Sequence, residues 1–197
     1  MPLPSGDSLL VKIMSDSFAD AAARAGQHLV CREGCSQCCH GAFALGPLDA
    51  LRLQAGMETL RASDPNLARE VEHRASMWTV EHEAAFPGDF QTGILGDTPE
   101  ERERFESFAN EAPCPALDTE TGRCDVYKWR PMTCRLFGPP VRMGEGQELA
   151  HCELCFKGAS EAEVAACEME VPFELESEIL AEIPSKGETV VAFALLK

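Results

Sequence analysis

The stretch CREGCSQCCH, residues 31–40, places four cysteines within nine positions and ends in a histidine. Its first three cysteines, Cys31, Cys35 and Cys38, follow the spacing C-x(3)-C-x(2)-C, and the fourth comes directly after them. Gaps this short allow one loop to wrap several thiolates around a single metal centre, and Gly34 supplies the backbone freedom that such a loop needs. The stretch therefore predicts a metal-binding loop between the elements on either side of it.

The cysteines must be interpreted against the size and location of the protein. The chain has 197 residues, ten of them cysteines, and is long enough to bury a hydrophobic core without covalent cross-links. Its first residues, MPLPSGDSLLVKIMSDSF, show no basic stretch before an apolar run, and the longest apolar run, VVAFALL at 190–196, is too short to cross a bilayer. We therefore expect a cytoplasmic protein without a membrane segment, whose reduced cysteines bind metal rather than form disulfides.

The charges of the chain are unevenly distributed. The formal net charge is -16, which disfavours nucleic acid as a partner over most of the surface. Segment 123–142 carries five basic residues against Asp125, a balance of +4, whereas segment 143–183 carries eleven glutamates against Lys157, a balance of -10. The basic segment contains later cysteines, where cations offset the negative charge of metal-bound thiolates. We expect the acidic segment to be a solvated helix face, with contact to a basic partner as the alternative.

Helical spacing of apolar residues dominates the chain outside the cysteine segments. Two helix starts are marked by a capping side chain followed by proline, at Asp64-Pro65 and Thr98-Pro99. Gly56 is expected to weaken the helix in which it lies. The predicted helices cover residues 8–29, 48–60, 65–85, 99–112 and, interrupted at Pro172, the acidic region 160–183.

The segment 113–158 differs from the rest because it consists of short pieces punctuated by proline and glycine. It predicts one hairpin over 116–127, with its turn near 120–122, and a second over 139–152. The apolar TVVAFALL near the C-terminus is either a buried strand or a last turn of helix. We therefore predict a mainly α protein with a small α+β cysteine-rich metal-binding insert, in a single compact domain over 1–197.

Six further cysteines follow the loop at 31–40: Cys114, Cys124, Cys134, Cys152, Cys155 and Cys167. A single C-x(2)-C pair, such as the one at Cys152 and Cys155, is a weak signal, but a cluster of four with several more indicates a metal site. Thiolates are soft donors that suit zinc or iron–sulfur clusters and poorly suit calcium or magnesium. We expect loop 31–39 and segments 114–155 to close one composite metal site between helices.

The order of these motifs resembles the cysteine-cluster (YkgJ-like) proteins, which are described as zinc- or iron-chelating domains. The matching text is C-REG-C-SQ-CC, then CPAL, then CDVYKWRPMTCRLF, then a late cysteine, over roughly residues 31–155. Cys155 and Cys167 fall outside the pattern, and Cys155 is an alternative to Cys152. The resemblance implies that eight cysteines form the metal site: Cys31, Cys35, Cys38, Cys39, Cys114, Cys124, Cys134 and Cys152.

The identity of the metal stays open at the level of the sequence. Eight thiolates suit either two tetrahedral zinc sites or one 4Fe-4S cluster with four other cysteines, and we expect the iron–sulfur cluster, with zinc as the alternative. The spacing C-x(3)-C-x(2)-C is also that of enzymes which use S-adenosylmethionine for radical chemistry. However, Gln37 stands where those enzymes usually carry an aromatic residue, and no series of alternating strands and helices predicts their barrel.

Several residues beside the cysteines are candidates for a supporting role. Arg130 and Arg135 are expected to donate N–H bonds to sulfur, with surface ion pairs or an anion-binding patch as alternatives. Tyr127 and Trp129 lie between two candidate ligands and are expected to pack over the site and exclude water, with stacking on a substrate as the alternative.

The cysteine cluster leaves two further questions about ligation. Adjacent Cys38 and Cys39 are expected to point in different directions, so that they serve different metals or one of them only packs; a strained disulfide between them is the alternative. His40 and His151 each adjoin a candidate ligand and are either polar surface residues or replacements for a cysteine.

These observations predict a metal-binding protein whose iron–sulfur cluster serves structure, electron transfer or metal handling. The alternatives are a zinc protein of the same kind, a disulfide scaffold, and an enzyme for methyl or group transfer or redox chemistry that uses an open position at the metal. Related clusters in flagellin lysine methylases suggest methyl transfer, but the chain lacks the glycine-rich loop of a Rossmann-type methyltransferase. The expected partner is a protein or a small molecule.

Overall fold

The structure is a computed structural model of the chain that describes all residues except 1, 33, 143–147 and 185–186. The chain is mainly α-helical, with two antiparallel sheets of two strands each among the described residues, which confirms the predicted fold class. It divides into two compact units. The first unit comprises Met1–Leu3, Glu33–Pro131 and Ile183–Lys197, and the second comprises Pro4–Arg32 and Met132–Glu182. The single domain over 1–197 stays a prediction.

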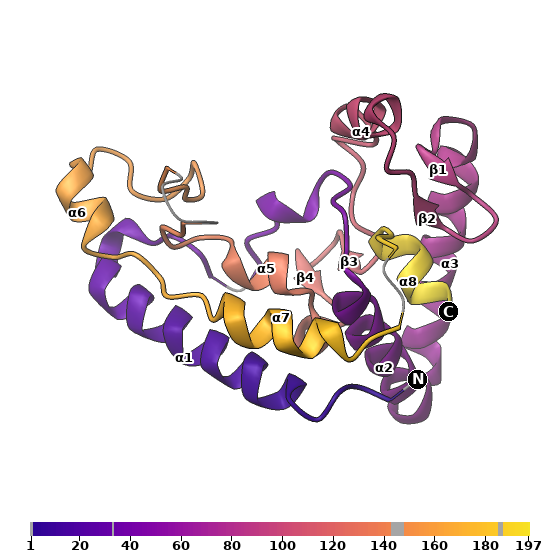
Figure 1. Cartoon of the computed structure of the whole chain (residues 1–197), viewed down its shortest axis with the longest axis horizontal. Helices are drawn as coiled ribbons and strands as arrows, with labels where there is room; N and C mark the ends of the chain where they lie inside the picture. The colour runs from indigo at the N-terminus through magenta and orange to yellow at the C-terminus, as the bar shows by residue number, and fades with distance from the viewer. Residues whose placement is uncertain (1, 33, 143–147, 185–186) are drawn as a thin grey trace. The chain divides into compact units, whose positions relative to one another are not determined.

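The first unit is built around three helices. Helices α2 (Pro47–Ser63), α3 (Pro65–His82) and α8 (Val191–Leu196) all pack on one another (Figure 1). The C-terminal apolar segment is therefore a helix rather than a strand. The unit also contains α4 (Pro99–Glu106), the strand pairs β1 (Gly88–Asp89) with β2 (Ile94–Leu95) and β3 (Leu117–Asp118) with β4 (Arg123–Cys124), and the 3₁₀ turns Gln37–Cys39, Glu83–Ala85 and Tyr127–Trp129.

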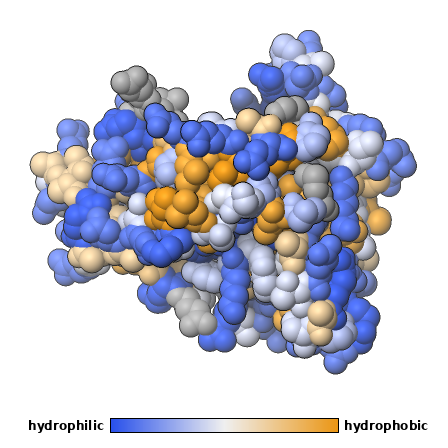
Figure 2. All heavy atoms as spheres, turned by 60° about the horizontal axis from the view of Figure 1, so that its bottom comes forward, coloured by the Kyte–Doolittle hydropathy of each residue, from blue (hydrophilic) through white to orange (hydrophobic). Residues whose placement is uncertain are grey.

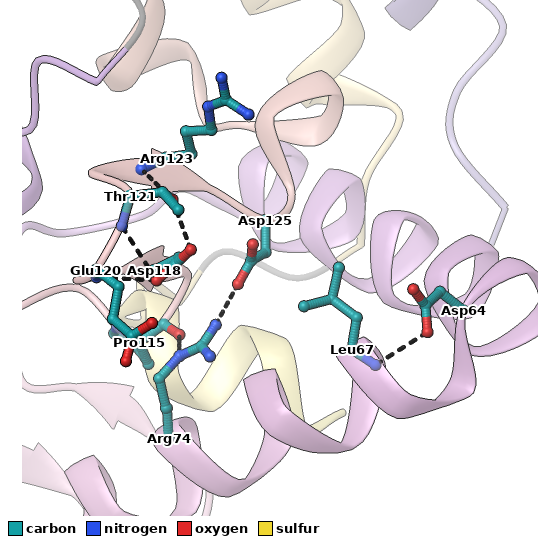
Figure 3. A network of polar contacts seen from close by, with 9 residues as sticks. All are labelled: Asp64, Leu67, Arg74, Pro115, Asp118, Glu120, Thr121, Arg123 and Asp125. Carbon is teal, nitrogen blue, oxygen red and sulfur yellow. Dashed lines mark hydrogen bonds and ion pairs between the residues drawn. The ribbon is translucent and has the colours of Figure 1, made fainter.

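Local capping explains where two of these helices begin. The Asp64 side chain accepts hydrogen bonds from the backbone N–H groups of Asn66 (3.2 Å) and Leu67 (3.1 Å), so α3 begins where the sequence predicts. Figure 3 shows the bond from Leu67. Thr98 and Glu101 form a capping box at the start of α4. This helix ends at Glu106, short of the predicted end, and Ala109 follows with a φ of 52° that is incompatible with a continuing helix.

The cysteine segments of the first unit pack against the core that its helices form. Its fully buried residues from α2, α3 and α8 include Leu53, Met57, Val71, Ala75, Ala194 and Leu195. Cys114, Cys124 and Trp129 pack against this cluster. Burial of the apolar faces of the helices therefore also holds the β3–β4 hairpin, which the sequence predicts over 116–127 with its turn near 120–122.

Gly56 allows Trp129 to approach helix α2. A Cβ atom added at Gly56 would lie 2.7 Å from the Cβ and Cγ atoms of Trp129, which is closer than real contacts allow. Gly56→Ala is therefore expected to lower the free energy of unfolding by about 1–3 kcal/mol, measured by urea denaturation. In a Trp129→Gly background, which removes both of these atoms, the same change should be neutral or stabilising by up to about 1 kcal/mol, because alanine has a higher helix propensity than glycine. Destabilisation of equal size in both backgrounds would contradict this packing role.

The second unit is built on the N-terminal helix α1 (Asp7–Ala25), against which α5 (Met132–Leu136) and α7 (Phe173–Ala181) pack (Figure 1). Helix α6 (Glu161–Ala165) ends where the guanidinium of Arg24 donates hydrogen bonds to the carbonyl oxygens of Ala166 and Glu168. The predicted interruption of the acidic helical region at Pro172 is confirmed, since α7 begins directly after it. Leu10, Met14, Ala21, Met169 and Ile179 are among its buried residues.

The predicted second hairpin over 139–152 is represented by one antiparallel bridge. Val141 and Ala150 exchange two backbone hydrogen bonds, at 2.8 and 3.0 Å. Residues 143–147 of the predicted hairpin lie outside the described residues.

Much of the molecular face drawn in Figure 2 is hydrophilic, and hydrophobic residues gather in a smaller area among the hydrophilic ones. None of the helices in the described part of the chain is both long and apolar enough to span a membrane.

Candidate metal centre

All ten cysteines lie within the described residues and carry thiols rather than disulfides. They divide equally between the two units. The first unit contains Cys35, Cys38, Cys39, Cys114 and Cys124, and the second contains Cys31, Cys134, Cys152, Cys155 and Cys167.

Backbone pairing brings the cysteine loop beside the segment that carries Cys114. The backbone N–H of Cys114 donates to the carbonyl oxygen of Cys39 at 2.8 Å, and that of Gly41 donates to Ala112 at 2.9 Å. An antiparallel bridge joins His40 to Pro113 between these bonds. The loop at 38–41 and the segment at 112–114 are thus fixed side by side, although they are far apart in sequence.

The β3–β4 hairpin brings Cys124 to the same place. Leu117 pairs with Cys124, and the backbone N–H of Leu117 donates to the carbonyl oxygen of Cys114 at 2.9 Å. The backbone N–H of Asp125 donates to the carbonyl oxygen of Ala116 at 2.9 Å. We call Cys38, Cys39, Cys114 and Cys124 the first thiol group.

The thiols of this group are close enough to shift one another's proton affinity. Burial, with a smaller contribution from the charge of Cys124, raises the pKa of the Cys114 thiol to about 12. Burial also raises the pKa of Cys124, where the charge of Cys38 adds to the effect. Partly buried thiolates therefore repel each other, and a bound cation would stabilise all of them at once.

The side chains of Cys38 and Cys39 were expected from the sequence to point in different directions. Their side chains are hydrogen-bonded to each other, and this bond is the main reason that the pKa of Cys38 falls to about 6 while that of Cys39 rises. The charges of Cys114 and Cys124 contribute to the rise at Cys39. The vicinal pair therefore presents both sulfurs to the same group.

Cys35 lies in the part of the loop that approaches the β3–β4 turn. Gly34 has a φ of 85°, and a Cβ atom on Gly122 would lie 2.7 Å from the carbonyl oxygen of Gly34. Glycine at both positions allows this close backbone approach. The turn itself is fixed by the Asp118 side chain, which accepts hydrogen bonds from Glu120 and Thr121 (Figure 3).

The predicted supporting residues have different surroundings. The pKa of Cys38 is lowered mainly by its hydrogen bond to Cys39 and to a smaller extent by the positive charge of Arg130, and the same charge partly offsets the rise that burial causes in the pKa of Cys124. The Cζ atom of Arg130 lies 4.1 Å from the ring centroid of Tyr127, in a cation–π contact. Tyr127 is 59% exposed, and its packing over the thiols stays a prediction. Arg135 belongs to the second unit, where it is buried on α5.

One side of the first thiol group borders the protein surface. Cys114 and Pro115 form part of the lining of an open cavity of about 890 Å³, whose other walls come from one face of α3 and from residues 107–119. Arg74, Met77 and Glu81 line it from the helix. The cavity connects a candidate ligand with solvent.

The second unit contains its own concentration of sulfur. Cys155 and Cys167 are buried in an apolar cluster, and Cys31 and Cys152 pack against it. The side chains of Cys152 and Cys155 are hydrogen-bonded, and burial raises the pKa of Cys152. Cys155 therefore lies beside Cys152, and this position is consistent with Cys155 as the alternative to Cys152 as the eighth ligand. Cys134 lies on α5 in the same unit.

The two histidines beside candidate ligands are exposed. The Nδ1 atom of His151 lies 3.0 Å from the carbonyl oxygen of Cys152, and the main chain of His40 forms the bridge to Pro113.

The first thiol group has the donor chemistry of a metal site but not a closed metal-binding geometry. Across the described residues, no three His, Cys, Asp or Glu side chains are arranged so that they could hold an ion. The group nevertheless provides four partly buried sulfur donors from three chain segments, which is the number that zinc or a 4Fe-4S cluster takes.

A protein-family model described as "CxxCxxCC: Putative zinc- or iron-chelating domain" matches residues 30–155. The chain belongs to this family. The match covers nine of the ten cysteines, all except Cys167, and it confirms the resemblance seen in the motifs. Metal binding by a cysteine cluster is the function that this family supports. Comparisons with curated proteins and with solved structures gave no match.

Proposed function

We propose that the chain carries an iron–sulfur cluster, held in the first unit by the first thiol group with Cys35 beside it. The observation that carries the proposal is the backbone pairing that brings the three segments with Cys38, Cys39, Cys114 and Cys124 side by side. The charges of neighbouring thiols of this group accordingly contribute to the raised pKa of Cys39, Cys114 and Cys124. The cluster, when bound, would serve structure, electron transfer or metal handling.

The remaining proposed ligands, Cys31, Cys134 and Cys152, belong to the second unit, together with Cys155. We propose that they also bind metal, because they belong to the eight cysteines that the family resemblance implies as ligands. The net charge of -16 favours a protein or small molecule over nucleic acid as the partner, and we propose a cytoplasmic location, where the thiols stay reduced.

Anaerobic purification of the full chain tests the identity of the metal. We expect a coloured protein with about four iron atoms and about four acid-labile sulfide ions per chain, and a visible absorption that bleaches on reduction. The measurements are elemental analysis, sulfide determination and absorption spectra before and after dithionite. A colourless protein with stoichiometric zinc would contradict the iron–sulfur cluster and support the alternative of a zinc-binding protein. A protein that takes up neither metal, even after reconstitution, would contradict both.

A further inference from the structure

Arg74 of α3 contacts the two residues that directly follow two of the proposed ligands. Its Nε atom donates a hydrogen bond to the carbonyl oxygen of Pro115 at 2.9 Å, and its Nη2 atom pairs with the carboxylate of Asp125 (Figure 3). Pro115 follows Cys114 and Asp125 follows Cys124. The guanidinium of Arg74 thus connects the backbone next to Cys114 with the side chain next to Cys124.

The surroundings of this contact distinguish it from an ordinary surface ion pair. The side chain of Asp125 is only 12% exposed and that of Arg74 is 30% exposed. A carboxylate that is largely removed from water needs a partner, because an unpaired buried charge is costly. The planar guanidinium also donates from two nitrogen atoms in fixed directions, which a lysine ammonium cannot reproduce.

The hairpin and the helix each have contacts of their own, and Arg74 adds a polar link between them to the apolar packing that already joins them. Pairing of Leu117 with Cys124 fixes the hairpin internally. On the helix side, Val71 and Ala75 are fully buried in the core next to Arg74. Arg74 therefore bridges a well-anchored part of α3 and the two chain segments that carry the thiols.

We propose that Arg74 is a positioning residue of the metal site, which orients the segments of Cys114 and Cys124 relative to each other for binding one metal centre. This inference rests on the proposed metal binding. Arg74 touches no sulfur in this role; it acts through Pro115 and Asp125. Residues that support metal ligands in this way typically change metal affinity about 10- to 100-fold when they are replaced.

The test compares Arg74→Gln and Arg74→Lys with the control Arg61→Gln. Arg61 is a matched control because it also forms a partly exposed ion pair, with Glu72 at 2.6 Å, between α2 and α3. The probe is Co²⁺, titrated anaerobically into the metal-free full chain and followed by its thiolate charge-transfer and ligand-field absorption. We expect Arg74→Gln to weaken Co²⁺ binding about 10- to 100-fold and to shift these bands. Arg61→Gln should bind as the wild type does.

The charge-conserving variant separates positioning from general stability. Arg74→Lys keeps an ion pair with Asp125 but not both hydrogen bonds, so it should fold normally and still bind Co²⁺ several-fold more weakly, with shifted bands. Wild-type affinity and spectra in a folded Arg74→Lys and in Arg74→Gln would overturn the inference while leaving the proposed function intact. Failure of the wild type itself to bind any metal would instead overturn the proposed function, and the inference with it.

Discussion

Replacing Cys124 by serine is expected to lower the affinity for the bound metal by more than about 100-fold. The Cys124 thiol interacts electrostatically with both Cys38 and Cys114, so its loss removes one of the four sulfurs of the first thiol group. Changing a residue that only supports a ligand already costs about 10- to 100-fold, and loss of the ligand itself should cost more. The measurement is the iron, sulfide and zinc content after anaerobic purification, together with the visible spectrum.

A second cysteine provides the control for this experiment. Cys167 is buried in the apolar cluster of the second unit and lies outside the residues that the family model matches. Cys167→Ala should therefore retain the metal content of the wild type, at a modest cost in stability from the lost sulfur. Full metal content in Cys124→Ser, with far-ultraviolet circular dichroism unchanged, would show that Cys124 is not a ligand. An equal loss in both variants would point to unfolding rather than ligation.

The sequence predicts the helix starts of this protein better than its helix ends. Asp64 and Thr98 act within three residues of their own position, so their capping role is visible in the local sequence. Helix α4 ends at Glu106, before the predicted end, and the positive φ of Ala109, which a continuing helix could not adopt, follows no local sequence pattern. The C-terminal segment could be assigned to a helix only once its packing on α2 and α3 was known. Tertiary contacts therefore decided what local patterns left open.

The residues of the candidate site were likewise predictable only where a local sequence pattern marks them. Spacing identified the thiols, because metal-binding loops need short gaps between ligands. Arg74 was missed, since its partner Asp125 lies 51 residues away and nothing in the sequence links the two. The hydrogen bond between the Cys38 and Cys39 side chains, which lowers the pKa of Cys38, was not predicted, because adjacent side chains were expected to point in different directions. The nature of the donors was predictable, but the groups that orient them were not.

Loss of the buried carboxylate on α2 is expected to have the largest effect on stability. The Arg52 side chain is only 2% exposed, and its Nη1 atom donates to Asp49, whose side chain is 10% exposed. Asp49→Ala takes this carboxylate away from a buried guanidinium, which typically costs about 3–5 kcal/mol. We expect a decrease of that size in the free energy of unfolding of the metal-free protein, measured by urea denaturation at neutral pH.

Two further variants decide whether the buried charge is the cause. Lys12 and Asp16 form an ion pair on α1 with both side chains largely exposed, so Asp16→Ala should change stability by less than about 1 kcal/mol. In the double variant Asp49→Ala/Arg52→Met the cation is absent too, and most of the lost stability should return, because an apolar side chain of similar length replaces a buried ion. If the double variant were as unstable as Asp49→Ala, the cause would lie in lost packing at position 49, and the ion pair would contribute little to the first unit.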